Sequence, residues 1–336
     1  MSLDLENIRR LLLQLGDEVR NRLVAARLEA DPASFATVSR ESVADTIYEI
    51  DRVSEAAIEL WFARNWPADL PVEVVMEGID PEQPLVLPDG VSVQDTVLKC
   101  ILDPIDGTRG IMYDKRSAWF LAGVAPQLGA ATRLQNIDVA VMVELPTTKQ
   151  WRADRCSAVR GQGIRAESVN IFSREVALLQ LRPSRADTML HGYGYISRFF
   201  PAGKALLAAI EQTIWERIYG SGTEKEIVIF EDQYISTGGQ FYELLSGRDP
   251  MIADLRPLIY RQLGLNLALC CHPYDVASML VLQEAGVVLE SPDGAPLDGP
   301  LDTTSPISWV AYANSDLANI VRPVLQKVLQ EFLDVG

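Results

Sequence analysis

Histidine is the scarcest of the residues that commonly carry chemistry, because the chain contains only His191 and His272. Zinc sites built on H-E-x-x-H or on three histidines are therefore excluded. A Ser-His-Asp hydrolase would have to use one of these two residues, and the G-x-S-x-G turn that usually presents its serine is absent. The phosphate-binding G-x-x-x-x-G-K-[ST] loop is absent as well. These absences indicate that the chemistry of the chain depends on carboxylates.

Cysteine is also scarce, and none of the four cysteines forms a C-x-x-C pair. We therefore expect free thiols and a reducing compartment. No apolar run approaches the ~20 residues that a membrane-spanning helix needs. The N-terminal residues lack the basic and apolar regions of a secretory signal. These features predict a cytoplasmic protein that does not enter a membrane.

Basic residues are also few, because 30 Lys and Arg against 46 Asp and Glu give a net charge of −16. Such a surface repels nucleic acid and anionic membranes, so we expect neither as a partner. It also repels a small phosphorylated metabolite. A site for such a substrate therefore needs local positive charge, which a bound metal ion would supply.

The chain has 336 residues, which suits two domains or one large domain in two parts. We predict an N-terminal α+β part over 1–165 and a C-terminal α/β part over 166–336. Hydrophobic periodicity predicts helices over 7–27, 45–63, 202–217, 236–246, 274–285 and 317–332. Apolar runs predict strands over 72–76, 97–102, 117–124, 138–144, 150–155, 176–181, 187–192, 227–230, 252–253, 267–271, 287–290 and 309–313, with a hairpin over 157–163.

The most informative stretch follows the buried strand expected over 97–102. Pro104 cannot donate to a strand ladder, so this strand is expected to end at Asp103. Asp103 and Asp106 then place two carboxylates three residues apart, next to the flexible Gly107. A plain turn explains a bare D-x-x-D-G, since these are ordinary turn residues. A hard cation such as Mg²⁺ is the usual reason for carboxylates to lie close together.

The complete string Asp103-Pro104-Ile105-Asp106-Gly107-Thr108 resembles the signature of the inositol monophosphatase family. That family comprises Mg²⁺-dependent, Li⁺-sensitive phosphomonoesterases that act on inositol phosphates, fructose bisphosphate or 3′-phosphoadenosine phosphates. The resemblance implies a mixed α+β / α/β fold, the layered αβαβα sandwich of the sugar-phosphatase type. It holds in order and spacing over residues 45–165 and 225–330 and is poor over 166–225.

Two further segments carry the resemblance. Glu77 follows a predicted strand where the family has a metal-ligating G-E-E motif, although Gly78 replaces the second Glu. The stretch from His272 to Ser278, followed by Glu284-Ala285-Gly286, resembles the W-D-x-A-[AG]…E-A-G-G pattern of the family. Asp275 then stands at the position of a third metal-ligating Asp. Its alternative role is the N-cap of a helix, which an isolated Asp often fills.

The resemblance implies a set of oxygen ligands for two or three Mg²⁺ ions, with Mn²⁺ as a substitute: Glu77, Asp103, the carbonyl of Ile105, Asp106 and Asp275. Metal pairs of this kind clamp both the attacking and the leaving oxygen. Glu77 and Thr108 would activate a water, and Asp51 would support Thr108. Asp51 is equally well explained as a solvated helix carboxylate. The backbone N–H groups of Gly107 and Thr108 would face the phosphate, and no covalent intermediate is needed.

Substrate choice is less clearly marked. Ser236 and Thr237 match a substrate-contacting helix start of the family, but they also read as an ordinary N-cap pair. At Arg109 the sequence departs from the commonest pattern of the family. Here it is more similar to the sequences of the branch that hydrolyses 3′-phosphoadenosine phosphates. An inositol phosphate is the first expectation, with 3′-phosphoadenosine 5′-phosphate and fructose 1,6-bisphosphate as alternatives. A non-catalytic, metabolite-binding relative is the alternative of another class, and the resemblance also suggests a homodimer.

Overall fold

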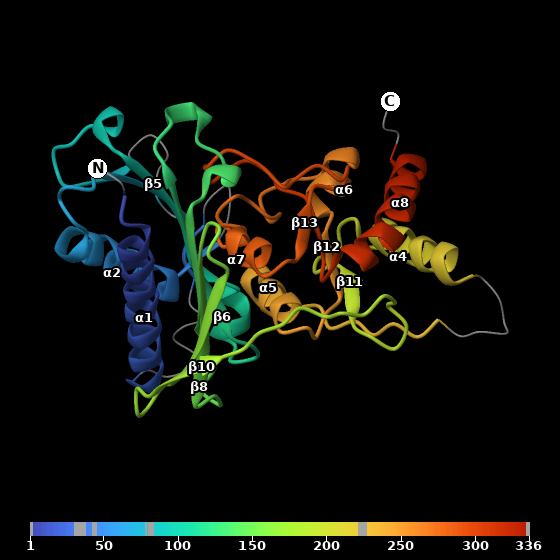
Figure 1. The fold of residues 1–336 in the computed structure, drawn as a ribbon, viewed down its shortest axis with the longest axis horizontal. Coiled ribbons are helices and arrows are strands. Elements are labelled where there is room, and N and C mark those ends of the chain that lie inside the picture. Colours follow the sequence, from blue (N-terminus) through green and yellow to red (C-terminus); the bar gives the residue numbers. More distant parts are fainter. Residues whose placement is uncertain are drawn as a thin grey trace.

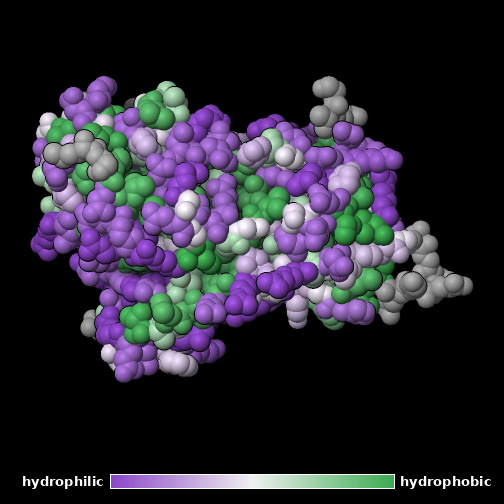
Figure 2. Space-filling model, viewed as in Figure 1, coloured by the Kyte–Doolittle hydropathy of each residue, from purple (hydrophilic) through white to green (hydrophobic). Residues whose placement is uncertain are grey.

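The computed structural model describes residues 3–29, 38–41, 46–77, 79, 84–220 and 227–333, with side chains omitted for 28–29, 38–41 and 46–56. Its layers alternate helix, sheet, helix, sheet and helix, from α1 and α2 at one side to α4 and α8 at the other (Figure 1). This is the αβαβα sandwich predicted from the Asp103–Thr108 string. On the face shown in Figure 2 hydrophilic residues dominate, with hydrophobic patches near the middle, at the left and at the right of the view.

The helices and strands have the following bounds. The helices are α1 Leu5–Glu29, α2 Glu49–Asn65, α3 Thr108–Met112, α4 Lys204–Tyr219, α5 Thr237–Leu245, α6 Arg256–Gln262, α7 Met279–Glu284 and α8 Ser315–Phe332. The strands of the N-terminal half are β1 Val38–Glu41, β2 Thr46–Tyr48, β3 Val72–Met76, β4 Leu85–Leu87, β5 Leu98–Asp106, β6 Ala118–Pro126, β7 Val139–Leu145, β8 Arg152–Val159, β9 Ile164–Asn170 and β10 Val176–Leu179. The later strands are β11 Gly194–Ile196, β12 Met251–Asp254, β13 Val288–Glu290 and β14 Trp309–Tyr312.

The larger sheet has eight strands in the order β10-β9-β8-β7-β6-β5-β3-β4. Only β3 and β5 are parallel neighbours in it, and Met76, the last residue of β3, lies beside Leu102 of β5. That pairing brings the residue after β3, Glu77, toward the end of β5. The smaller sheet has the order β11-β12-β14-β13, and β1 pairs with β2 alone.

Three buried clusters separate the layers. The first joins α1 and α2 to one face of the larger sheet, through residues such as Leu12, Phe62 and Phe120. The second fills the space between the two sheets around α5 and α7, and it includes Trp119, Phe241 and Trp309. The third packs α4, α6 and α8 on the far face of the smaller sheet. The amphipathic patterns read from the sequence are thus used to cover four sheet faces.

The end of β5 differs from its prediction in a way that shapes the site. The strand does not stop at Asp103 but continues to Asp106. Asp103 pairs with Leu121 and Asp106 with Trp119, so two residues lie opposite one and form a bulge. A bulge tolerates Pro104 because its missing N–H has no ladder partner to lose.

Other predicted elements were wrong in type or extent. Residues 187–192 and 267–271 are not strands, and the helix predicted over 274–285 is α7, which begins only at Met279. Residues 46–48 form β2 rather than the start of a helix, and 227–230 contribute only the isolated bridge between Phe230 and Tyr193. Short apolar runs cannot distinguish strands from loops that are partly buried.

The predicted boundary at residue 165 falls within β9, and both β9 and β10 belong to the larger sheet. All four cysteines are buried and unpaired, as expected of free thiols. Among the described residues, no helix has the length and apolar character needed to cross a bilayer.

Candidate metal centre

A cleft opens where the carboxyl end of β5 meets the loops before α5 and α7. Its cavity volume is about 140 Å³. Segments that are distant in sequence line it, namely Glu77, residues 103–109, Phe199, Phe200, residues 235–237, Arg256, residues 268–270, Tyr274 and Asp275. Nearly every residue predicted to carry chemistry therefore lies on one cleft.

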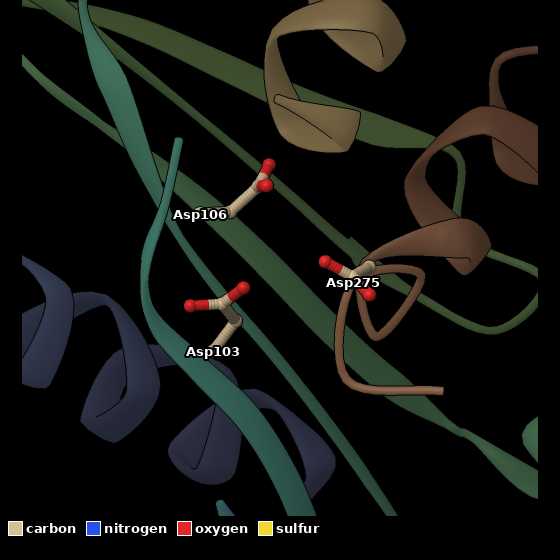
Figure 3. Close-up of side chains that lie close together, drawn as sticks. All are labelled: Asp103, Asp106 and Asp275. Carbon is tan, nitrogen blue, oxygen red and sulfur yellow. The ribbon is translucent and has the colours of Figure 1, made fainter. Parts of the chain in front are cut away.

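Three carboxylates form a close group at the bottom of this cleft. Asp103, Asp106 and Asp275 each offer an oxygen, and these oxygens all lie within 4.8 Å of one another. Figure 3 shows Asp103 and Asp106 on β5 and Asp275 on the loop before α7, around a common space. Asp103 and Asp106 are only 2% and 6% exposed, and Asp275 is partly buried. The β5 bulge lies between Asp103 and Asp106, so it changes the strand geometry that positions these two carboxylates.

Each carboxylate is held in place by a donor from the protein. The backbone N–H of Ile105 donates to Oδ1 of Asp103 at 2.9 Å. The backbone N–H of His272 donates to Oδ2 of Asp275 at 2.6 Å. Asp275 is therefore not a helix N-cap, since α7 begins four residues later, after Ser278. Its carboxylate faces the other two aspartates instead of capping a helix.

Asp106 is held by the start of α5. The hydroxyl of Ser236 donates to Oδ2 of Asp106 at 2.7 Å and accepts from the N–H of Gly239 at 2.9 Å. Ser236 is thus the N-cap of α5, one of the two roles considered for it, while it also orients a carboxylate. The backbone N–H groups of Thr237 and Gly238 donate to Asp106 as well.

The glycines at the start of α5 explain how the helix approaches so closely. A Cβ on Gly238 would lie 2.6 Å from Cβ of Trp119, and one on Gly239 would lie 2.4 Å from the Tyr234 ring. Such separations are not tolerated between side chains. Gly107 is also required, because its φ of +96° is left-handed and a Cβ there would lie 2.9 Å from Cβ of Ser236.

Burial raises the pKa values of all three carboxyls, and the charges of neighbouring carboxylates raise those of Asp103 and Asp275 further. Burial, then the charges of Glu77, Asp106 and Asp275, holds the pKa of Asp103 well above its usual range. Burial and the Asp106 charge do the same for the pKa of Asp275. Burial raises the pKa of Asp106 to about 6 against the opposing hydrogen bonds from α5. Three buried acids pointing at one another are costly unless a cation joins them, and their oxygens are the ligands that Mg²⁺ prefers.

The remaining predicted site residues lie on the cleft with different partners. Glu77 lines it but is outside the close group of three. The carbonyl of Ile105, a predicted metal ligand, accepts from the Thr108 hydroxyl at 2.9 Å. Arg109 and Thr237 also line the cleft. Asp51 lies in α2, but its side chain is outside the described residues.

Two sequence motifs prove to be a single structural unit. The carboxylate of Glu284, in the E-A-G stretch, accepts from the N–H groups of Gly161 and Gly163 at 2.7 Å each. The hairpin between β8 and β9 is therefore fastened to the end of α7. This contact supports the reading of both motifs as parts of one fold.

Sequence reasoning missed the outer wall of the cleft. Arg256 forms a buried ion pair with Asp254, and Phe199 and Phe200 lie beside it. The charged pair directly after the apolar stretch 251–253 was a signal, because a buried strand end seldom carries two charges without a purpose. The two phenylalanines gave no signal, since aromatic residues are ordinary core residues.

The architecture and the site together define a class, the αβαβα sandwiches with a carboxylate group at the end of a central strand. Solved structures share this fold with the chain. The extragenic suppressor protein suhB from Bartonella henselae has a TM-score of 0.63 at 15% identity, covering 96% of this chain and 99% of its own. Fructose-1,6-bisphosphatase from Leishmania major has a TM-score of 0.65 at 12% identity, covering 94% and 92%. Staphylococcal IMPase-I has a TM-score of 0.61 at 11% identity, covering 97% and 96%.

At these identities the likeness establishes a shared fold, and the fold expected from the Asp103–Thr108 string is confirmed. Comparison with protein-family models finds no match, and comparison with curated proteins finds none either.

Proposed function

We propose that the chain is a Mg²⁺-dependent phosphomonoesterase that hydrolyses a small phosphorylated alcohol. The observation that carries this proposal is the close group of Asp103, Asp106 and Asp275 at the bottom of an open cleft. The solved structures with the same fold include a fructose-1,6-bisphosphatase and an inositol monophosphatase, which supports the reaction class. Among the described residues, no other group of three or more carboxylates, histidines and cysteines has ligand atoms close enough to hold an ion.

The carboxylates would hold the metal, and the protein fixes their orientation. Asp103, Asp106 and Asp275 would be ligands, joined by Glu77 and the Ile105 carbonyl. Bound Mg²⁺, or Mn²⁺ in its place, would activate a water and stabilise the leaving oxygen as a Lewis acid. The donors from Ile105, His272 and Ser236 keep the carboxylates aimed at one space, which is the support that metal ligands commonly receive.

The residues of the Gly107 turn would bind the phosphate and position the water. Backbone N–H groups of Gly107 and Thr108 would face the phosphate oxygens, and Arg109 would reach a further anionic group. Glu77 would accept the proton of the attacking water, with Thr108 orienting it and Asp51 supporting Thr108. Direct attack by water leaves no covalent intermediate on the protein.

The alcohol half of the substrate would lie toward Ser236 and Thr237. The sequence favours an inositol phosphate, with 3′-phosphoadenosine 5′-phosphate and fructose 1,6-bisphosphate as alternatives. The free buried thiols are compatible with a cytoplasmic location. We retain the homodimer as a proposal that rests on the resemblance alone.

The test is phosphate release from a panel of these esters with Mg²⁺, with chelator, and with added Li⁺. We expect release that requires Mg²⁺, decreases with Li⁺, and falls at least 100-fold in Asp103→Asn. The exposed Asp69→Asn is the matched control and should retain activity. Equal release by Asp103→Asn and wild type would refute the proposal.

Gly78, in place of a second Glu, favours the alternative of a non-catalytic relative. Calorimetric titration with Mg²⁺ and Mn²⁺ separates the two. Binding of neither ion, together with no turnover across the panel, would support the non-catalytic alternative. Metal binding that Asp275→Asn abolishes would support the phosphatase.

A further inference from the structure

The outer wall of the cleft has a composition different from that of its carboxylate end. We call it the alcohol wall, since in the proposed function the leaving alcohol would lie against it. Its members are Phe199, Phe200, Ile235, Arg256, Ala268 and Leu269. Five of the six are apolar, and Ile235 and Leu269 remain 47% and 39% exposed. Apolar side chains left open beside a polar site favour a ligand with an apolar part.

Arg256 is the single cation of the alcohol wall, and its ion pair with Asp254 holds it in place and neutralises its charge. Nε of Arg256 donates to Oδ1 of Asp254 at 2.9 Å, and Nη1 donates to the carbonyl of Leu269 at 2.9 Å. Asp254 is fully buried and Arg256 is 6% exposed. Because the pair is neutral overall, it is a weak attractor for a second phosphate. The bonds found among the described residues use three of the five guanidinium N–H groups, so two can donate to an acceptor on a ligand.

Two aromatic rings lie beside this donor, nearly at right angles to each other. The guanidinium carbon of Arg256 lies 4.6 Å from the Phe199 ring centroid and 5.8 Å from that of Phe200. The two rings meet edge to face, with centroids 6.4 Å apart. Stacked cation and ring systems accept a further planar group readily, because every aromatic ring has a face that can stack.

A polyol fits this wall poorly. Each hydroxyl of such an alcohol loses its water on binding and needs a hydrogen-bond partner in exchange. The serine that lines the cleft, Ser236, already donates its hydroxyl to Asp106 and accepts from Gly239. A flat ring needs few such partners and gains contact with Phe199, Phe200 and Leu269 instead.

Four residues of the alcohol wall lie outside the motifs that resemble the inositol monophosphatase family. Phe199 and Phe200 come from the 166–225 stretch, where the likeness to the inositol monophosphatase family is poor. Arg256 and Leu269 come from a stretch between β12 and α7 that includes α6. The choice of alcohol therefore depends on residues that the shared motifs do not specify.

We propose that the leaving alcohol of the substrate carries a flat aromatic ring that lies against Phe199 and Phe200, with Arg256 donating to an acceptor on the alcohol. This inference rests on the proposed phosphomonoesterase function, and it favours a ring-bearing alcohol over the inositol phosphate that the sequence favours. The ring could belong to a nucleoside or to a simple aryl-alkyl alcohol, and these sources share the same stacking chemistry.

The test compares two pairs of esters that differ only in the ring. One pair is 3-phenylpropyl phosphate and n-propyl phosphate, and the other is adenosine 3′-phosphate and the 3-phosphate of methyl ribofuranoside. We expect kcat/KM to be about tenfold higher for the ring-bearing member of each pair. A preference in one pair alone supports the proposal and identifies the source of the ring. myo-Inositol 1-phosphate serves as the polyol comparison and should resemble the ring-free members.

Variants distinguish a binding wall from mere packing. Phe199→Leu and Phe200→Leu should each bring the ratio of ring-bearing to ring-free kcat/KM toward one. Loss of packing alone would lower both members of a pair equally and keep the ratio. Phe172→Leu, an exposed ring outside the cleft, is the matched control and should leave the ratio unchanged. Ratios near one in both pairs for wild type, or unchanged ratios in both cleft variants, would overturn the proposal.

Failure of the proposed phosphatase function can be distinguished from failure of the proposed alcohol wall. If none of the esters releases phosphate with Mg²⁺, the phosphatase proposal fails, and calorimetry with the same intact esters then tests the wall. Tighter binding of the ring-bearing members, lost in Phe199→Leu, would support the wall without catalysis. Equal binding within both pairs would overturn it.

Discussion

The hydroxyl of Ser236 donates a 2.7 Å hydrogen bond to Oδ2 of Asp106, although the two residues are 130 positions apart. Both are buried, and the same hydroxyl caps α5 through the N–H of Gly239. One side chain therefore stabilises a helix start and fixes a carboxylate of the candidate metal centre. The packing of α5, in the second half of the chain, therefore helps to fix the position of Asp106 at the end of β5.

Replacement of Ser236 by alanine should affect stability and metal binding together. Loss of the N-cap should lower the free energy of unfolding by about 1 kcal/mol. Loss of support for Asp106 should weaken Mg²⁺ binding by about tenfold or more, as is usual for partners of metal ligands. Urea unfolding in chelator and calorimetric Mg²⁺ titration measure the two effects. Ser236→Thr keeps the hydroxyl and should restore most of both, whereas an unchanged Mg²⁺ affinity in Ser236→Ala would contradict the supporting role.

Gly238 should not tolerate a side chain. In Gly238→Ala the new Cβ would meet Cβ of Trp119 at 2.6 Å, so α5 must move away from β6. We expect a loss of about 1–3 kcal/mol in unfolding free energy, the usual range for overpacking, and weaker Mg²⁺ binding because the Gly238 N–H then leaves Asp106. Gly110→Ala, whose Cβ would have contacts of 3.6 Å or more, is the control and should not lose stability. Equal stability of the two variants would refute this account.

Sequence patterns were sufficient where the signal is local. The strand 72–76 and the carboxylates after residue 102 follow from apolar runs ended by turn residues, and β3 has the predicted bounds. The β5 bulge was not predictable, because its form depends on pairing with β6. Asp275 was placed by its resemblance to a family motif, but the loop that presents it was not predicted, because the helix expected from residue 274 begins only at Met279.

The parts that were missed depend on contacts between distant segments. Nothing near Ser236 indicates that its hydroxyl meets Asp106, since that contact forms only when α5 packs on β6. Phe199 and Arg256 lie together because β11 and β12 are parallel neighbours, which sequence spacing does not reveal. Local chemistry thus predicted the carboxylate end of the cleft, and tertiary packing determines its other end.

Removal of one carboxylate should have opposite effects without and with metal. In chelator, Asp275→Asn removes repulsion among buried acids, so we expect it to unfold at the same or a higher temperature than wild type. With Mg²⁺, wild type should gain stability by mass action, about 2.7 kcal/mol at 100 times the dissociation constant. The variant should gain much less. Asp69→Asn, an exposed control, should gain as much stability with Mg²⁺ as wild type. An equal gain in Asp275→Asn would show that Asp275 is not a metal ligand.

Asp249 should make stability fall as pH rises through the weakly acidic range. Burial, then the charges of Glu243 and Asp232, raises its pKa to about 7, against the opposing charges of Arg116 and Arg248. The folded carboxyl therefore holds its proton up to near pH 7, whereas the unfolded one releases it near pH 4. Between these values the folded state binds more protons, so the free energy of unfolding decreases with rising pH, by at most about 1.4 kcal/mol per unit of pKa difference.

Asp249→Asn removes this titration and isolates its contribution. Below pH 4 both carboxyl states are protonated, so the variant should match wild type apart from a constant offset. From pH 4 to 7 the difference in unfolding free energy should shift steadily in favour of Asp249→Asn, and above pH 7 it should stay level. Other titrating groups cancel in the difference because both proteins contain them. Urea unfolding at several pH values measures it, with Asp69→Asn as the exposed control. A difference that does not change with pH would mean that folding leaves the pKa of Asp249 at its unfolded value.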